Sequence, residues 1–149
     1  IMKIKFTTKY SEKIENRLLH YSIEDLSFDT EPNVSRIDLS LILNKLNLTV
    51  VDNKIVQIWG FCGNARTVKT TKDVPSYFKG TLMIEHSLQY GISYGIYNNE
   101  VPVYFNDKSG WVCLGNIDST GEAVEFITNC VAVVNDEKLD ALWLKPKWE

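Results

Sequence analysis

The side chains in this sequence best suited to proton transfer or nucleophilic attack are two histidines and three cysteines. The histidines are His20 and His86, and the cysteines are Cys62, Cys113 and Cys130. A histidine beside a thiol can form a nucleophilic pair in which the imidazole removes the thiol proton. No local signature links His86 to Cys62 or Cys113, so buried structural cysteines and a surface histidine are the favoured interpretation.

Metal and phosphate chemistry are not indicated by the spacing of the residues. Structural zinc ligands usually lie about two to five residues apart, and neither histidine has such a partner. The sequence has no CxxC, and Asp107–Gly110 is too short for a calcium loop. The glycines of Gly60–Gly63 and Gly91–Gly95 do not match a phosphate-binding loop. We therefore expect no metal site and no cofactor.

Acidic residues are concentrated in one part of the chain. From Glu12 to Glu31 there are six acidic and two basic residues, a balance of −4, whereas the whole chain has a formal charge of −3. A solvated acidic face explains this pattern without any function. The functional alternative is a docking surface for a basic partner, because complementary charge speeds association. The candidate partner-binding residues in this segment are Glu24, Asp25, Asp29 and Glu31.

Tryptophans supply a further candidate for partner binding. Trp59, Trp111 and Trp143 each lie near the start or end of an expected strand. Large aromatic residues are mostly part of the core, although they also anchor interfaces. Because Trp111 follows a turn, we predict that it is partly exposed and add it to the partner-binding residues.

Length and composition indicate one domain over residues 1–149. The chain is 44% hydrophobic and 23% charged, which is typical of a globular domain with its own core. No run approaches the roughly 18 uncharged apolar residues of a membrane span, and Ile1–Lys5 does not look like a signal peptide. The three separated cysteines fit reduced thiols, so we expect a cytoplasmic protein. The net negative charge argues against direct nucleic-acid binding.

Alternating apolar and polar residues predict a mainly β fold. Residues 37–43 alternate clearly, and a turn at Asn44–Lys45 leads into a second alternating run. Asp52–Lys54 is a second turn, and a third strand covers residues 55–61. Three adjacent strands with short turns predict an antiparallel meander.

The second half of the chain repeats the strand pattern. Strands are expected at residues 81–85, 101–105 and 111–114, and Pro102 indicates that the second of them lies at a sheet edge or contains a bulge. Residues 90–96 alternate large side chains with glycine or serine. This predicts strong curvature or another element packed closely against the small residues.

Two short segments are candidates for helices. Ser119 and Glu122 have capping-box spacing, which predicts a helix over residues 121–128. Residues 11–20 are the other candidate, because apolar residues recur there at four-residue spacing, although an overlapping alternation leaves a strand open. The expected fold class is mainly β (α+β): an antiparallel meander sheet, or a partly closed barrel or sandwich, with one or two short helices.

Three stretches carry a resemblance: Lys54–Gly63 (KIVQIWGFCG), Ser109–Gly115 (SGWVCLG) and Leu139–Pro146 (LDALWLKP). In size, acidity and β content the chain resembles the bacterial immunity proteins of contact-dependent inhibition and related polymorphic toxin systems. The resemblance implies a cytoplasmic, non-enzymatic protein that binds and neutralises the C-terminal domain of a cognate toxin. A basic nuclease toxin would suit the acidic candidate residues. No functional residue of these proteins maps onto a position of this sequence.

A second hypothesis belongs to a different class of function. A small β-barrel ligand-binding protein or enzyme would use the face around Tyr90, Tyr94 and His86. A deep apolar pocket with convergent polar groups would favour this hypothesis. The identity of the partner, the oligomeric state and the strand order stay open at this point.

Overall fold

The alternating sequence forms strands throughout the computed structural model, which describes residues 3–86 and 88–149. Fourteen strands form one open mixed sheet, which confirms the mainly β prediction. Within these described ranges there is no helix, and hence none with the length and hydropathy of a membrane span.

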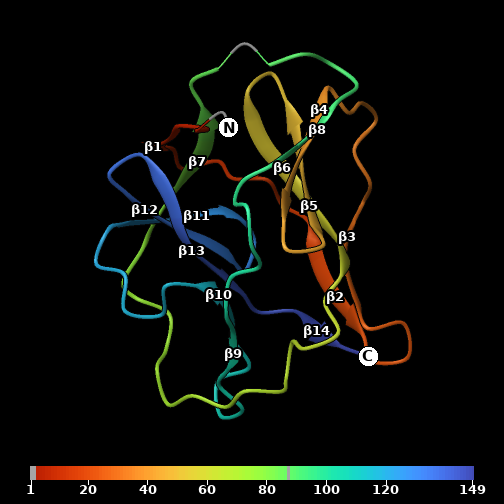
Figure 1. The fold of residues 1–149 in the computed structure, drawn as a ribbon, viewed down its shortest axis with the longest axis vertical. Coiled ribbons are helices and arrows are strands. Elements are labelled where there is room, and N and C mark those ends of the chain that lie inside the picture. Colours follow the sequence, from red (N-terminus) through yellow and green to blue (C-terminus); the bar gives the residue numbers. More distant parts are fainter. Residues whose placement is uncertain (1–2, 87) are drawn as a thin grey trace.

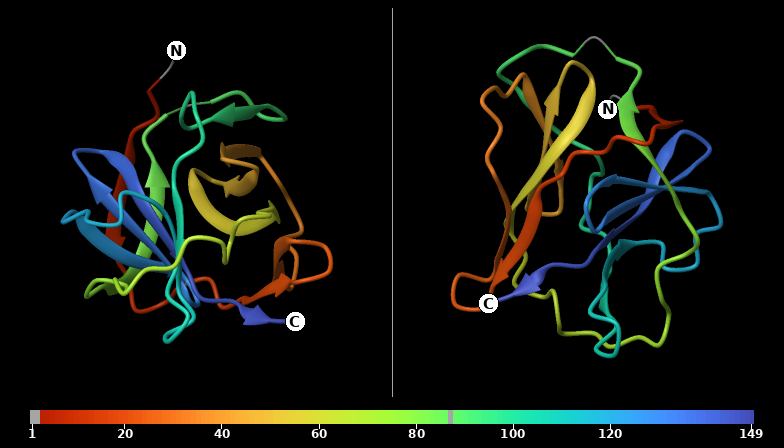
Figure 2. Two further views of the ribbon diagram at one scale, coloured as in Figure 1. Left: turned by 60° about the horizontal axis from the view of Figure 1, so that its bottom comes forward. Right: turned by 180° about the vertical axis from the view of Figure 1, so that it is seen from behind.

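The strands lie in two groups, which Figures 1 and 2 show side by side. The first strand group contains, in spatial order, β14 (Lys147–Trp148), β2 (Leu18–Ser22), β3 (Ser27–Glu31), β6 (Lys54–Phe61), β5 (Leu46–Val51), β4 (Leu39–Leu43) and β8 (Ser93–Gly95). The second contains β1 (Phe6–Tyr10), β7 (Phe78–Ile84), β11 (Glu122–Ile127), β12 (Cys130–Asn135), β13 (Lys138–Leu144), β10 (Val112–Gly115) and β9 (Val103–Phe105). The groups are joined where Lys54 of β6 pairs with Met83 of β7.

The predicted meander is confirmed as β4, β5 and β6, which pair in antiparallel order. Asn44 has a φ of 56° in the first turn, and Asp52 and Asn53 have φ values of 51° and 62° in the second. Short hairpin turns need this left-handed backbone, which Asn and Asp adopt more easily than other side chains. The edge alternative for the strand near Pro102 agrees with the strand order, in which β9 comes last, although an isolated bridge joins Lys69 to Phe105 on its outer side.

Both helix predictions are wrong. Residues 122–127 form β11, which pairs with β12 on one side and β7 on the other, so the sheet satisfies its backbone groups. Ser119 lies in a turn instead of capping a helix, and its N–H donates to the carbonyl of Asn116 at 3.1 Å. Residues 11–17 form a non-helical connection, in which Glu15 bridges to Ile127, and the chain then enters β2.

Of the two alternatives predicted for residues 90–96, strong curvature or a closely packed element, the closely packed element is wrong. A Cβ atom added at Gly91 would meet no atom within 4 Å, and one at Gly95 would meet only the carbonyl oxygen of Tyr97 at 3.7 Å. The ordered strand here covers only Ser93–Gly95, which pairs in parallel with β4. This segment therefore lies at an open side of the sheet.

The main hydrophobic core draws residues from both strand groups, including Leu41 and Ile58 of the first and Leu82 and Leu142 of the second. A smaller cluster lies on the other face of the second group and contains Trp111 and the fully buried Cys113, Val131 and Val133. Thus β10 to β13 are buried on both faces.

Trp111 belongs to this smaller cluster and is only 6% exposed, so the prediction of partial exposure is wrong. Val74, from the long connection before β7, packs against the cluster. The connection that carries Val74 thus covers the face of the sheet on which Trp111 lies, although the turn before Trp111 suggested that this face would be exposed.

Candidate functional site

Outward-facing side chains of β2, β3 and β6 form a continuous surface. Ser27 pairs with Phe61, and continuing this antiparallel register by two residues brings Asp29 opposite Trp59. On the buried side, the Thr30 hydroxyl donates to the carbonyl oxygen of Ile58 at 3.1 Å, which agrees with this register.

His20 of β2 pairs with Asp29 and extends the surface across the next strand. We use the term outer face for the surface formed by His20, Asp29, Glu31, Trp59 and Phe61.

Two aromatic residues are exposed on the outer face. Trp59 is 38% exposed, and its indole N–H donates to the hydroxyl of Thr49 on β5 at 3.1 Å. Phe61 is 45% exposed, and the Lys45 ammonium lies 5.4 Å from its ring centroid. Tryptophan is enriched among residues that dominate binding energy, so Trp59 is the strongest candidate for an interface anchor.

Carboxylates surround His20 at the other side of the outer face. Its Nδ1 lies 3.1 Å from a carboxylate oxygen of Glu149, and its Nε2 lies 3.6 Å from one of Glu31. These contacts are ion pairs only when the imidazole is protonated. Because β14 pairs with β2, Glu149 is brought to the same surface as Glu31.

The structure places the five predicted partner-binding residues in three locations. Asp29 and Glu31 are exposed on β3 within the outer face, while Glu24 and Asp25 are exposed in the β2–β3 turn next to it. Trp111 is buried in the second strand group, far from them along the sheet.

Sequence reasoning missed Trp59 as an exposed residue. The available signal was local, at the end of β6, where burial of Ile58 directs its neighbour Trp59 to the opposite face.

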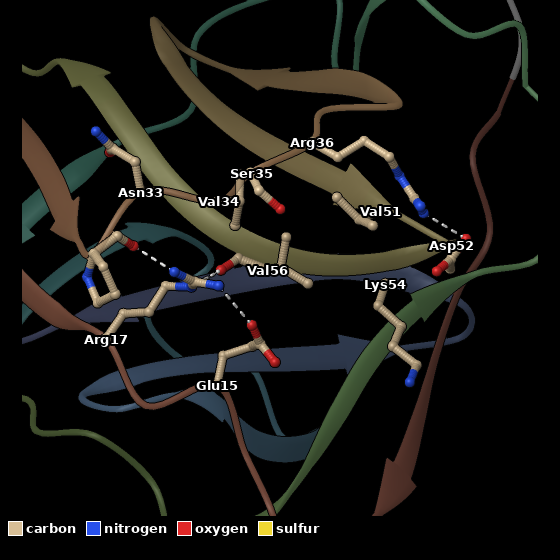
Figure 3. A pocket seen from close by; sticks show the side chains of 11 residues that line it. Glu15, Arg17, Asn33, Val34, Ser35, Arg36, Val51, Asp52, Lys54 and Val56 are labelled. Carbon is tan, nitrogen blue, oxygen red and sulfur yellow. Dashed lines mark hydrogen bonds and ion pairs between the residues drawn. The ribbon is translucent and has the colours of Figure 1, made fainter.

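A groove of about 530 Å³ adjoins the outer face and is shown in Figure 3. One wall is formed by residues 32–36, which follow directly from β3, and the other includes Glu15 and Arg17. Val51 and Val56 of the β5–β6 hairpin line it between these walls. The groove is thus built from three segments that are separate in the sequence.

Arg17 holds these segments together. Its Nε donates to the carbonyl oxygen of Val56 at 3.0 Å, and its Nη2 donates to Glu15 at 3.0 Å. Its Nη1 donates to the carbonyl oxygen of Pro32 (Figure 3). The side chain is only 15% exposed, so its charge is held within the groove lining by fixed partners.

Arg36 bridges two carboxylates at the other end of the groove. It donates to Asp38 at 3.0 Å and to Asp52 at 2.7 Å. Asp38 is 4% exposed and also accepts the backbone N–H of Asp52 at 2.8 Å. This backbone bond, followed by the Arg36 guanidinium, holds the pKa of Asp38 below its usual value of 3.8.

Lys54 is the third basic side chain of the groove lining. It is exposed, and none of the ion pairs found among the described residues involves it. Its ammonium is therefore free to meet an incoming anion.

The cysteine side chains have the properties of buried structural thiols. Burial raises the pKa of Cys62 to about 11 and that of Cys113 to about 12, and it also raises the pKa of Cys130. The Nε2 of His86 accepts the backbone N–H of Lys5 at 3.0 Å. Across residues 3–86 and 88–149 no group of three His, Cys, Asp or Glu side chains has the geometry of a metal site.

The residues of the alternative ligand-binding hypothesis lie at the open side of the sheet. Tyr90 is 65% exposed, and the Tyr94 hydroxyl accepts the backbone N–H of Gln89 at 3.1 Å. Neither tyrosine lines the groove beside the outer face.

No known protein family matches the chain, and a comparison with curated proteins finds none that is significantly similar.

Proposed function

We propose that this chain is a non-enzymatic bacterial immunity protein that binds and neutralises the C-terminal domain of a cognate toxin in the cytoplasm. The observation that carries the proposal is the position of the exposed Trp59 beside Asp29 and Glu31 on one sheet face. An aromatic anchor with neighbouring carboxylates suits a partner that combines an apolar pocket with basic surroundings.

The sheet supplies a rigid support for this surface. The backbones of β2, β3, β5 and β6 are paired side by side, and Trp59 is fixed by its bond to Thr49. A side chain held in place loses little conformational entropy on binding, which favours tight association. Tight association is what neutralisation of a toxin requires.

The carboxylates favour a basic partner such as a nuclease. A nuclease groove must be positive to bind phosphates, and acidic side chains of an inhibitor compete for it. Asp29 and Glu31 would face such a groove directly, while Glu24 and Asp25 in the β2–β3 turn extend the negative surface. On this proposal the protein needs no cofactor, because neutralisation is achieved by occupying the toxin.

The candidate toxin for the test is the C-terminal domain of a large secreted protein encoded by the gene directly upstream, and the absence of such a gene would count against the proposal. Binding of this purified domain is measured by isothermal titration calorimetry with the unmodified protein and with two double variants. W59A with D29K is expected to lose most of the binding. The control pair, Y77A with E85K, removes a similarly exposed aromatic and reverses an acidic residue in the second strand group, and it is expected to bind normally. Equal binding by both variants would contradict the assignment of the outer face.

A further inference from the structure

We propose that the groove between residues 32–36 and Glu15–Arg17 binds a carboxylate-bearing segment of the same protein partner. The inference rests on the proposed function and adds to it a second contact, centred on the unpaired Lys54. The outer face would meet basic side chains of the partner, and the groove would receive an acidic side chain that projects from it.

Among the charged side chains that line the groove, Lys54 is the one without an ion-pair partner in the described part of the chain. Arg36 has five N–H groups, and its bonds to Asp38 and Asp52 use two of them. Lys54 contributes three more donors and has no carboxylate partner among the described ion pairs. The lining carboxylates Glu15 and Asp52 are already paired with arginines. An incoming carboxylate would pair with the Lys54 ammonium.

The wall of the groove is fixed before any ligand arrives. Gln57 is 5% exposed, and its amide donates to Asn33 at 3.1 Å while its carbonyl accepts the N–H of Val34 at 3.3 Å. Arg17 anchors the opposite side by its bonds to Val56 and Pro32. A site whose walls are already held in place needs little reorganisation to bind a partner.

The mixed lining favours an acidic peptide segment over a small inorganic anion. Val34, Val51 and Val56 line the groove together with the charged groups. Figure 3 shows the valines between Arg17 and Glu15 at one end and Arg36 and Lys54 at the other. The methylene groups of a glutamate side chain and the adjoining peptide would cover these apolar side chains. An inorganic anion has no such groups to place there.

Position in the fold links the groove to the outer face. Glu31 ends β3 on the outer face, and the next residue, Pro32, begins the groove wall. One partner can therefore cover both surfaces at once. A partner that fits both carries a basic patch with an acidic projection beside it.

The groove is tested without the toxin, by two-dimensional NMR of the isotope-labelled full chain. The probe is an acetylated, amidated Gly-Glu-Glu-Gly peptide, and the control is the matching Gly-Gln-Gln-Gly peptide. The Glu peptide is expected to shift the amide signals of residues 33–36 and 52–54, and the Gln peptide is not. K54E is expected to weaken this binding about two- to fivefold, as expected for an exposed ion pair. K108E, a reversal in the β9–β10 turn, is expected to leave it unchanged.

Three results would overturn the inference: no shifts at the groove, equal shifts with the Gln peptide, or binding of inorganic phosphate as tight as that of the Glu peptide. The last would identify a general anion site. If the peptide fails to bind while the toxin domain still binds the outer face, the groove assignment falls and the proposed function stands. If the peptide binds the groove while the upstream domain does not bind the protein, the groove chemistry stands and the proposed function falls.

Discussion

The indole of Trp59 lies against the neighbouring strand because its N–H donates to the buried Thr49 hydroxyl at 3.1 Å. This bond satisfies a hydroxyl that is fully buried, and it leaves 38% of the tryptophan exposed. The same contact therefore stabilises the sheet and holds an aromatic side chain ready on the outer face. Trp59 is therefore held in one position by a hydrogen bond, whereas an exposed tryptophan without such a bond would be free to change rotamer.

Replacing Trp59 should weaken partner binding in protein that is still folded. W59A is expected to cost about 2 kcal/mol or more of binding free energy if the residue is an interface hot spot. The loss of one hydrogen bond should lower the free energy of unfolding by about 1 kcal/mol, and the lost packing of the buried part of the side chain should lower it further. Calorimetric titration and urea denaturation measure the two quantities. Y77A is the matched control, and an equal loss of binding in this variant would remove the special role of Trp59.

Charge reversal on β3 should act mainly on the rate of association. D29K with E31K is expected to slow association with a basic partner and to reduce its dependence on salt concentration. Stopped-flow mixing at several ionic strengths measures both effects. The same change in the β2–β3 turn, E24K with D25K, is expected to have a smaller effect because the turn lies beside the outer face. An association rate that does not respond to the β3 reversal would sink the electrostatic assignment.

Asp38 should make stability depend on pH in the acid range. Because its pKa is lowered in the folded state, the carboxylate contributes its full stabilisation above the unfolded value of 3.8. The contribution is lost as the pH falls through the lower folded value. D38N should therefore be less stable than the unmodified protein near neutral pH, and the difference should shrink below about pH 4. Urea denaturation at a series of pH values measures the difference in free energy of unfolding between D38N and the unmodified protein. A difference that stays constant from neutral pH to below about pH 4 would contradict the stabilising role of the Asp38 carboxylate.

The thiols should react slowly in the folded protein. With a pKa of about 11, only roughly 0.1% of Cys62 is thiolate at about pH 8. All three cysteines are buried. A chromogenic disulfide reagent should label almost none of them in the native protein, and all three after guanidinium denaturation. Rapid labelling of any one thiol in the native protein would show that the site is open and would revive a nucleophilic role for it.

Truncation of Trp111 should affect stability alone. The side chain is 6% exposed and packs in the smaller cluster, so W111A is expected to lower the free energy of unfolding by about 3–5 kcal/mol. Partner binding by the fraction that remains folded should be unchanged. Denaturant unfolding combined with titration of the active fraction separates these effects. A stable variant with reduced affinity would return Trp111 to the interface.

The parts of the fold that the sequence predicts correctly depend on local pattern. The meander of β4, β5 and β6 follows from strict alternation and from Asn and Asp at the turns, and both signals act within a few residues. The edge position of β9 is one of the two alternatives that follow from the missing N–H of Pro102. These features need no knowledge of what packs against them.

The failures have a common physical cause. The capping-box spacing at Ser119 and Glu122 is a weak local preference, and pairing of residues 122–127 with β7 and β12 outweighs it. Burial of Trp111 depends on the connection that carries Val74, nearly forty residues earlier in the chain. Tertiary contacts of this kind leave no periodic signal in the segment that they affect.

The candidate site was partly visible in the sequence. The acidic segment predicts Asp29 and Glu31 as binding residues, and both lie on the outer face. The same pattern does not distinguish them from Glu24 and Asp25, which lie in the turn. The groove was not visible at all. Arg17, Arg36 and Lys54 come together only because three separate segments meet at the β5–β6 hairpin.

Growth rescue is the decisive test of whether the outer face neutralises a toxin. The candidate toxin domain, where the gene directly upstream encodes one, is expressed in a bacterial host with the unmodified protein, with W59A combined with D29K, or with the control Y77A combined with E85K. We expect the domain alone to stop growth. The unmodified protein and the control variant should restore growth, and the W59A combination, present at equal level, should not. A toxic domain whose effect the unmodified protein leaves unchanged would contradict the account, as would full rescue by the W59A combination.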